Sequence, residues 1–322
     1  MTAKLRCLIH CSQPRALCIA AEGLGVSIFP VEAYSCPVSH RRRKPSSGGR
    51  ETRLDPWRRF PFRTCCIMTA FVPDRRWIHD HVGPPLSIAH RGASAHAPDN
   101  TLAAFEKAHE LGADMWEVDI RLTADGVPVA FHDADLLRLS GDPRKVADVS
   151  ADELFALTAA SGRQAPDFAE VARLAAKTGA GIYLDAKENR AASAAIDILI
   201  AYRIERVIIG ANTPEDCAER IASGSSYPVS LLVGLGADPF ELAGGCGAEI
   251  VHPCWERAGD RPDLLLDESF FRTASRLGLP VVTWHEERAD VIAALVEMPL
   301  LGICSDTPEQ VSQYRRPKHV AP

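Results

Sequence analysis

Residues 115–133 read MWEVDIRLTADGVPVAFHD, in which two short apolar segments flank the sequence ADG. We expect residues 115–119 and 127–132 to form β-strands. The connection between them is too short for a crossover helix, so the two strands are predicted to pair as a hairpin with its turn at residues 124–126.

The expected register of this hairpin brings chemically active side chains together. Pairing Leu122 with Val127 places Glu117 opposite His132. Because side chains alternate along a strand, Glu117, Asp119 and His132 are predicted to project from one face.

Outside the hairpin, short apolar segments alternate with segments of helical period. Eight segments are predicted as parallel strands: 86–89, 115–119, 181–185, 207–210, 229–233, 249–252, 280–284 and 302–305. Helical segments such as TLAAFEKAHELG (101–112) and DESFFRTASRLG (267–278) open on a capping Thr or Asp and end on Gly. Strands joined in this way by right-handed crossovers predict a (β/α)8 TIM-type barrel with an extra β-hairpin after the second strand.

Residues 1–67 differ from the rest of the chain in charge. They carry 12 Lys and Arg against 4 Asp and Glu, a net charge of +8, whereas the remaining residues carry a net charge of −14. Neither strand nor helix period persists in this segment, which holds six of the ten cysteines. We therefore expect residues 1–67 to be a poorly structured, dispensable extension and residues 68–322 to form the barrel domain. The extension is interpreted as an over-extended reading frame, with Met68 as the alternative start. A basic partner-binding or targeting arm is the alternative.

The composition of the chain argues against several classes of function. The acidic barrel domain argues against nucleic-acid binding. No run of about 18 to 20 apolar residues predicts stable membrane insertion. The cysteines after residue 67 lack the C-x-x-C spacing of a metal site and are expected to be reduced thiols of a cytoplasmic, rather than secreted or periplasmic, protein. The sequence leaves the oligomeric state open.

Polar residues at the ends of the first three predicted strands form the candidate site, since the carboxyl ends of barrel strands carry the active site. They are His90, Arg91, Glu117, Asp119, His132, Asp185 and Lys187. Three clustered carboxylates repel one another unless a cation neutralises them. An all-oxygen ligand set selects one hard divalent cation, Mg²⁺ or Ca²⁺.

The cations and imidazoles beside this metal site suggest a reaction. Arg91 and Lys187 suit a phosphoryl group. His90 and His132 suit proton transfer as base and acid at neutral pH. Metal-assisted phosphodiester cleavage uses all of these parts, with water or a neighbouring substrate hydroxyl as the nucleophile.

The same residues lie in motifs of a known family. AHRGAS (89–94), APDNT (97–101) and the 115–133 segment resemble the HRG, PENT, E-x-D, T-x-DG and HD motifs of the glycerophosphodiester phosphodiesterase family, and YLDAK (183–187) and SDTPEQV (305–311) continue the resemblance. It spans residues 86–311 and implies a PI-PLC-like phosphodiesterase barrel with a small-molecule phosphodiester substrate. The implied roles are a divalent metal on Glu117, Asp119 and Asp185, acid/base catalysis by His90 and His132, and phosphate binding by Arg91 and Lys187.

Three positions depart from the family pattern. Asp99 replaces the glutamate of PENT, Asp185 replaces a metal-ligand glutamate, and His285-Glu286 follows Trp284 where small residues and an asparagine are common. We therefore expect an altered leaving-group pocket. Its expected substrate-binding residues are Trp284, His252 and His285. Trp284 fits a core position and a platform for the alcohol equally well.

The leading hypothesis is a metal-dependent phosphodiesterase that converts a glycerophosphodiester, or a related soluble sugar or opine-type phosphodiester, to an alcohol and a phosphomonoester. A lysophospholipase D, which needs an apolar groove at the rim, is one alternative. A non-catalytic barrel that binds phosphorylated ligands is the other.

Overall fold

The computed structural model describes residues 17–22, 25–30 and 71–315. The chain divides into two units, Met1–Cys66 and Ile67–Pro322. In the first, β1 (Leu17–Glu22) and β2 (Gly25–Pro30) pair as an antiparallel hairpin that the sequence pattern did not predict. The rest of 1–67 lies outside the described residues, so the proposed dispensable extension stays a prediction.

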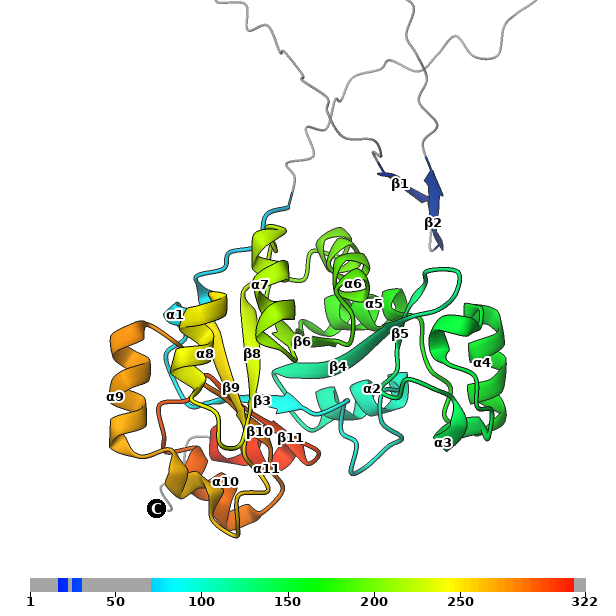
Figure 1. Ribbon diagram of the computed structural model, residues 1–322. Helices are drawn as coiled ribbons and strands as arrows, with labels where there is room; N and C mark the ends of the chain where they lie inside the picture. The colour runs from blue at the N-terminus through cyan, green and yellow to red at the C-terminus, as the bar shows by residue number, and fades with distance from the viewer. Residues whose placement is uncertain (1–16, 23–24, 31–70, 316–322) are drawn as a thin grey trace, which may run out of the picture. The chain divides into compact units, whose positions relative to one another are not determined.

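Eight parallel strands of the second unit form the barrel, which confirms the predicted fold (Figure 1). They are β3 (Leu86–Ala89), β4 (Met115–Leu122), β6 (Gly181–Ala186), β7 (Val207–Ala211), β8 (Val229–Gly234), β9 (Ile250–Cys254), β10 (Val282–His285) and β11 (Gly302–Ser305). Their order is β10-β11-β3-β4-β6-β7-β8-β9. A parallel bridge between Val251 and Val281 joins the two ends of this order, so the barrel is nearly closed.

Helices connect the strands, and several begin and end where the sequence places capping residues. They are α1 (Trp77–Asp80), α2 (Leu102–Glu110), α3 (Leu137–Ser140), α4 (Ala151–Ala160), α5 (Phe168–Thr178), α6 (Asn189–Ala201), α7 (Pro214–Ala222), α8 (Pro239–Cys246), α9 (Glu268–Leu277), α10 (Ala289–Leu295) and α11 (Pro308–Ser312), with short 3-10 helices at Val146–Asp148, Pro262–Leu265 and Gln313–Arg315. Thr101 caps α2 by accepting a hydrogen bond from the Ala104 N–H, and Gly278 ends α9 in the left-handed conformation. Within the described residues, no helix combines the length and the apolar character needed to cross a membrane.

Alternation along β4 directs the acidic side chains into the barrel. Trp116 and Val118 belong to the core between the strands and the surrounding helices, whereas Met115 packs inside the barrel. Glu117 and Asp119 share the parity of Met115, so they continue the inward-facing row toward the carboxyl end of the strand.

The register of the hairpin differs from the predicted one by one residue. Strand β5 (Pro128–Ala130) is antiparallel to β4, and Leu122 pairs with Pro128 instead of Val127. The reason is a three-residue loop: the Thr123 N–H donates to the Val127 carbonyl, and the Val127 N–H donates back to Thr123 Oγ1. Because β5 ends at Ala130, the predicted pairing of His132 with Glu117 is wrong.

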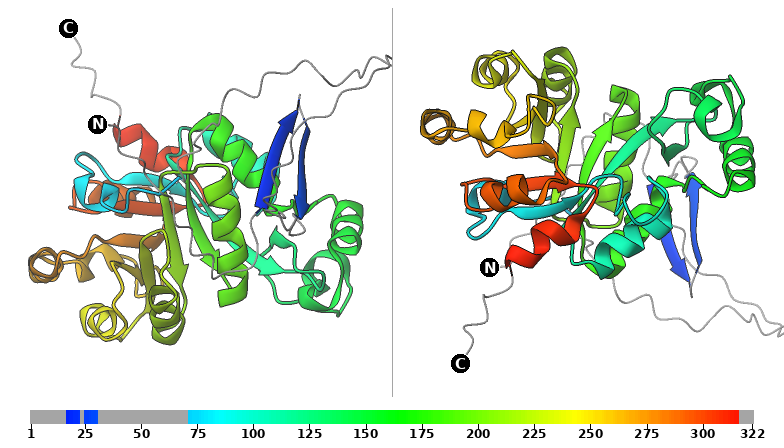
Figure 2. Two further views of the ribbon diagram at one scale, coloured as in Figure 1. Left: turned by 90° about the horizontal axis from the view of Figure 1, so that it is seen from above. Right: turned by 90° about the horizontal axis from the view of Figure 1, so that it is seen from below.

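Residues between β5 and α5 form a lobe at one side of the barrel, which contains α3 and α4 (Figures 1 and 2). The lobe has a small apolar core of its own: Val129, Phe131, Leu136, Val146, Val149, Leu154 and Ala165. In Figure 2 the lobe, in green, and α8 and α9, in yellow and orange, project from opposite sides of the barrel.

Candidate active site

Three buried carboxylates meet at the carboxyl ends of β4 and β6. The parallel register pairs Asp119 with Asp185, and Glu117 lies two residues earlier on the same inward face. Glu117, Asp119 and Asp185 each offer an oxygen within 4.8 Å of the other two. We refer to these three residues as the acidic cluster.

Two cations lie against the acidic cluster. Lys187 Nζ is 2.6 Å from Asp119 Oδ1 and 2.6 Å from Asp185 Oδ2, and Arg91 Nε is 3.0 Å from Asp119 Oδ2. Burial alone would raise the pKa of Asp119, but Lys187 and Arg91 hold it at about 2. Burial and the charges of Asp119 and Asp185 instead raise the pKa of Glu117 well above its usual range. With all three carboxylates ionised, two cations leave one negative charge uncompensated.

The backbone after β3 turns sharply so that the Arg91 N–H reaches the cluster. Arg91 has a φ of 55°, in the left-handed region that costs an ordinary residue about 1 kcal/mol or more. Its N–H donates to Glu117 Oε2 at 2.9 Å, which offsets part of that cost. Gly92 follows with a φ of 82°, and a Cβ there would lie 2.6 Å from the Ala104 carbonyl carbon, so no larger residue fits.

Two asparagines that sequence analysis did not assign to the site orient the carboxylates. Asn100 donates from Nδ2 to Asp119 Oδ2 at 2.7 Å and accepts the Asp119 N–H at 3.2 Å. Asn212, at the end of β7, donates to Asp185 Oδ1 at 2.7 Å. The APDNT motif could have indicated Asn100, whereas no sequence signal distinguishes Asn212.

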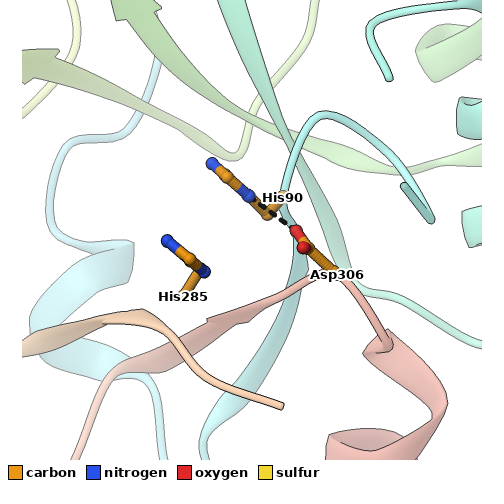
Figure 3. A group of neighbouring side chains, drawn as sticks. All are labelled: His90, His285 and Asp306. Atoms are coloured by element: carbon orange, nitrogen blue, oxygen red, sulfur yellow. Dashed lines mark hydrogen bonds and ion pairs between the residues drawn. The ribbon is translucent and has the colours of Figure 1, made fainter. Parts of the chain in front are cut away.

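His90 is held by a carboxylate from the last strand. Its Nδ1 is 2.6 Å from Asp306 Oδ1, and Asp306 also accepts a hydrogen bond from Ser94 (Figure 3). The His285 ring stacks on His90 with ring centroids 4.7 Å apart and an interplanar angle of 2°. Asp306 lies in the quoted SDTPEQV motif, but sequence analysis gave it no role.

A cavity of about 150 Å³ opens beside the acidic cluster. It is lined by His90, Glu117, Tyr183, Asp185, Leu232, His252, Cys254, Glu256, Trp284, His285 and Cys304. We call its His90, His252, Trp284 and His285 side the enclosed wall. The structure thus brings all three predicted pocket residues to one cavity.

The enclosed wall is rigidly supported. Trp284 is buried and donates from Nε1 to Glu286 Oε2 at 3.2 Å. Glu286 is 2% exposed and also accepts hydrogen bonds from Arg288 Nε at 2.7 Å and from the backbone N–H groups of residues 287 and 288. Burial, together with the charges of His90 and His285, lowers the pKa of His252 to about 3, so this ring is neutral, and its Nδ1 is 2.8 Å from the Tyr183 hydroxyl.

His132 lines a separate depression, which it shares with Asp99 and Arg138. Its Nδ1 is 2.8 Å from Asp133, which in turn accepts from Arg138 Nε at 2.5 Å. We call Asp99, His132, Asp133 and Arg138 the open wall. His132 does not line the enclosed cavity, but its charge helps to lower the pKa of Asp119.

The acidic cluster has the donor set of a hard divalent cation. All three ligands are carboxylates, which favours Mg²⁺ or Ca²⁺ over softer metals. Three ionised carboxylates face two cations, Arg91 and Lys187, so the cluster lacks one positive charge, which a bound dication would more than supply. The residues present therefore fit a single divalent metal.

The (β/α)8 barrel and the acidic cluster flanked by Arg, Lys and His define a class, the metal-assisted phosphoric ester hydrolases. Residues 90–310 match the model of the Glycerophosphoryl diester phosphodiesterase family. The chain belongs to this family, whose members hydrolyse glycerophosphodiesters.

Individual relatives agree with this assignment. A glycerophosphodiester phosphodiesterase from Caldanaerobacter subterraneus subsp. tengcongensis is 27% identical over 238 residues, which cover 70% of this chain and 95% of that protein. The crystal structure of the glycerophosphodiester phosphodiesterase from Thermotoga maritima superposes on this chain with a TM-score of 0.60 at 24% identity. The superposition covers 73% of this chain and 99% of that one. A phosphodiesterase from Oleispira antarctica, in complex with the product sn-glycerol-3-phosphate, has a TM-score of 0.60 at 20% identity, covering 71% and 96%. The two structures share the barrel fold.

Proposed function

We propose that this chain hydrolyses a glycerophosphodiester, or a related small soluble phosphodiester, to an alcohol and a phosphomonoester. The observation that carries the proposal is the acidic cluster: three buried carboxylates within 4.8 Å, with Arg91 and Lys187 against them. Glu117, Asp119 and Asp185 would hold one divalent cation, which when bound acts as a Lewis acid on the phosphoryl oxygens.

Charge balance supports a phosphodiester as the ligand. With Glu117, Asp119 and Asp185 all ionised to hold the metal, the acidic cluster with Arg91 and Lys187 carries one net negative charge, so a dication leaves one net positive charge. A phosphodiester carries one negative charge and makes the assembly neutral. Arg91 and Lys187, no longer needed to compensate the carboxylates, can then turn toward the phosphate oxygens.

The two histidines would divide the proton transfers between the walls. His90 lines the cavity of the enclosed wall, whereas His132 lines the separate depression of the open wall. A displacement at phosphorus places the incoming and leaving oxygens roughly in line, on opposite sides. One histidine can therefore deprotonate the nucleophile while the other protonates the departing alkoxide.

The cavity favours a small polar alcohol over a lysophospholipid. Among the described residues that line it, Leu232 is the one aliphatic side chain, so the cavity offers no aliphatic groove for an acyl chain. We therefore prefer the soluble diester over the lysophospholipase D alternative.

Hydrolysis of a diester panel tests the proposal. The panel contains glycerophosphocholine, glycerophosphoethanolamine, glycerophosphoglycerol and lysophosphatidylcholine, assayed for the released alcohol with EDTA and then with added Mg²⁺ or Ca²⁺. We expect hydrolysis of the three soluble diesters, its loss on chelation and its recovery with one of the ions. Glu117→Gln should lose activity by about 10³-fold, whereas Glu106→Gln, an exposed change on α2, should not. Binding of the diesters without turnover would instead identify a non-catalytic barrel.

A further inference from the structure

Arg121 continues the row of β4 residues that carries two members of the acidic cluster. It shares the parity of Glu117 and Asp119, so the three side chains follow one another toward the carboxyl end of the strand. Within the described part of the chain, however, Arg121 forms no ion pair with the acidic cluster. Its guanidinium contacts two other segments at this end of the barrel, and both carry residues of the proposed site.

Two donors of the Arg121 guanidinium join these segments. Nε donates a hydrogen bond to the His132 carbonyl oxygen at 2.9 Å. Nη1 donates to Glu188 Oε1 at 2.7 Å, and Glu188 directly follows Lys187 and precedes α6. A guanidinium presents its donors in a rigid planar fork, so one side chain fixes both acceptors relative to each other. Arg121 therefore connects the segment of His132 to the segment of Lys187.

The backbone of His132 has little other support. The ladder between β4 and β5 ends at Ala130, and the Phe131 N–H makes the last backbone contact of this segment with β4, to the Asp119 carbonyl at 3.0 Å. As far as the structure describes the chain, the bond from Arg121 is the one hydrogen bond made by the His132 backbone. The His132 ring contacts Asp133, which belongs to the same segment and would move with it. Arg121 is therefore the contact that ties His132 to the barrel.

Neither phosphate binding nor a simple surface ion pair explains these contacts as well. Arg91 and Lys187 lie against the acidic cluster, where a phosphate is expected, whereas the Arg121 donors Nε and Nη1 are engaged elsewhere. The Glu188 side chain is 49% exposed, so its ion pair with Arg121 contributes little by itself. The bond to the His132 carbonyl is partly buried and has a charged donor, which makes it the stronger of the two.

We propose that Arg121 is a positioning residue for His132, which it holds in place relative to Lys187 so that His132 can protonate the departing alcohol. This inference rests on the proposed function and assigns the acid role to His132. In that reaction a water oxygen bonds to phosphorus and gives its proton to His90. The bond from phosphorus to the alcohol oxygen breaks with its electron pair, and that oxygen takes a proton from His132. Exchange with solvent restores both histidines, and Arg121 acts through His132 alone.

The dependence on the leaving group tests this role, because a residue that acts through the acid matters only when the leaving group needs a proton. With glycerophosphocholine and Mg²⁺, Arg121→Gln should lower kcat by about 10- to 10²-fold and change KM by less than about threefold. With glycerol p-nitrophenyl phosphate, whose leaving group needs no proton, the variant should stay within about threefold of the wild type. Arg121→Lys keeps the charge but not the planar fork, so it should show the same substrate dependence with a smaller loss.

A double variant and two controls complete the experiment. In His132→Gln the acid is already absent, so adding Arg121→Gln should lower kcat/KM for glycerophosphocholine by less than about twofold more. Arg144→Gln changes an arginine of the lobe that pairs with Asp142 and Glu153, and it should match the wild type. Calorimetric titration with Ca²⁺ should give Arg121→Gln the affinity of the wild type, which shows that the acidic cluster is intact.

The other outcomes overturn the inference. Equal losses with both diesters, or a strongly raised KM, would mean that Arg121 acts on the phosphate or the metal and not through His132. Losses that add in the double variant would mean the same. Full activity of Arg121→Gln with glycerophosphocholine would mean that His132 needs no such support. If the wild type hydrolyses neither diester, the proposed function fails; if it hydrolyses them and Arg121→Gln shows no dependence on the leaving group, only the role of Arg121 fails.

Discussion

The two histidines proposed for proton transfer, His90 and His132, have very different surroundings. The side chain of His90 is 18% exposed, and its carboxylate partner Asp306 comes from the other end of the barrel sequence. The side chain of His132 is 37% exposed, and its partner Asp133 is the next residue in the chain. The enclosed wall is thus fixed by the closure of the barrel, whereas the open wall is fixed locally by the lobe. This difference suits enclosed His90 to the role of base and the more solvent-accessible His132 to the role of acid.

The largest expected effect comes from exchanging the leaving group. We expect both His90→Gln and His132→Gln to lose about 10² to 10⁴-fold in kcat/KM with glycerophosphocholine, whose alkoxide needs a proton. With glycerol p-nitrophenyl phosphate, whose leaving group needs none, His132→Gln should recover to within about tenfold of the wild type, and His90→Gln should not. Recovery of His90→Gln alone would reverse the assigned roles, and equal recovery of both variants would contradict the assignment of His132 as the acid.

The next prediction compares how much the contacts of the two walls contribute to the free energy of unfolding. Glu286→Gln removes the charge that binds Arg288 and Trp284 under the enclosed wall, and should lower the free energy of unfolding by about 2 kcal/mol, a value reduced for the partial exposure of Arg288. Asp99→Asn on the open wall, whose nearest arginine nitrogen is 3.4 Å away, should cost less than about 1 kcal/mol. Urea unfolding measures both. A larger loss in Asp99→Asn would mean that the contacts of the open wall contribute more to stability than those of the enclosed wall.

A smaller effect follows from the lowered pKa of Asp306. Its folded-state pKa of about 2 lies below the ordinary value of 3.8, so its ionisation stabilises the folded protein above pH 4, and this contribution is lost as the pH falls through 2. The stability difference between the wild type and Asp306→Asn should therefore shrink by about 1 to 2 kcal/mol between pH 5 and pH 2. The pKa of Asp133 on the open wall is also lowered, and its replacement by Asn should give a smaller change. Unfolding midpoints across this pH range would show whether the two carboxylates differ in this order.

The smallest effect is expected at the rim of the open wall. Arg138 is 45% exposed and contacts Asp133 and Asp99, so solvent and salt screen its contribution. Arg138→Gln should raise KM by about two- to fivefold at low salt and by less at 0.5 M salt, while Arg173→Gln on the exposed face of α5 should leave KM unchanged. A tenfold or larger effect that persists at high salt would place Arg138 in direct contact with the substrate.

Much of the fold could be predicted because its signals are local. Alternating strands and capped helices predict the barrel, and the two-residue period along β4 predicts that Glu117 and Asp119 face the same way. The hairpin register could not be obtained in this way, since it depends on whether Thr123 joins the ladder or the loop. The side-chain hydrogen bond of Thr123 decides this, and it shifts the pairing by one residue.

Charged residues in sequence motifs could be assigned to the candidate site from the sequence. Residues that join the site only through the geometry of the fold could not. Acidic and basic residues in motifs identify the acidic cluster with Arg91 and Lys187. Asn212 lies in no motif, and only the fold brings its Nδ2 to 2.7 Å from Asp185 Oδ1. The stacking of His285 on His90 depends on a β-bulge at Trp284 in β10, which a sequence of alternating residues does not reveal.

A crystal structure of His132→Gln with Ca²⁺ and glycerophosphocholine tests the central claim most directly. We expect the ion bound by Glu117, Asp119 and Asp185, the phosphate between it and Arg91 and Lys187, and one alcohol within the cavity of the enclosed wall. A diester bound away from the acidic cluster, or an acidic cluster that holds no ion at saturating Ca²⁺, would contradict it.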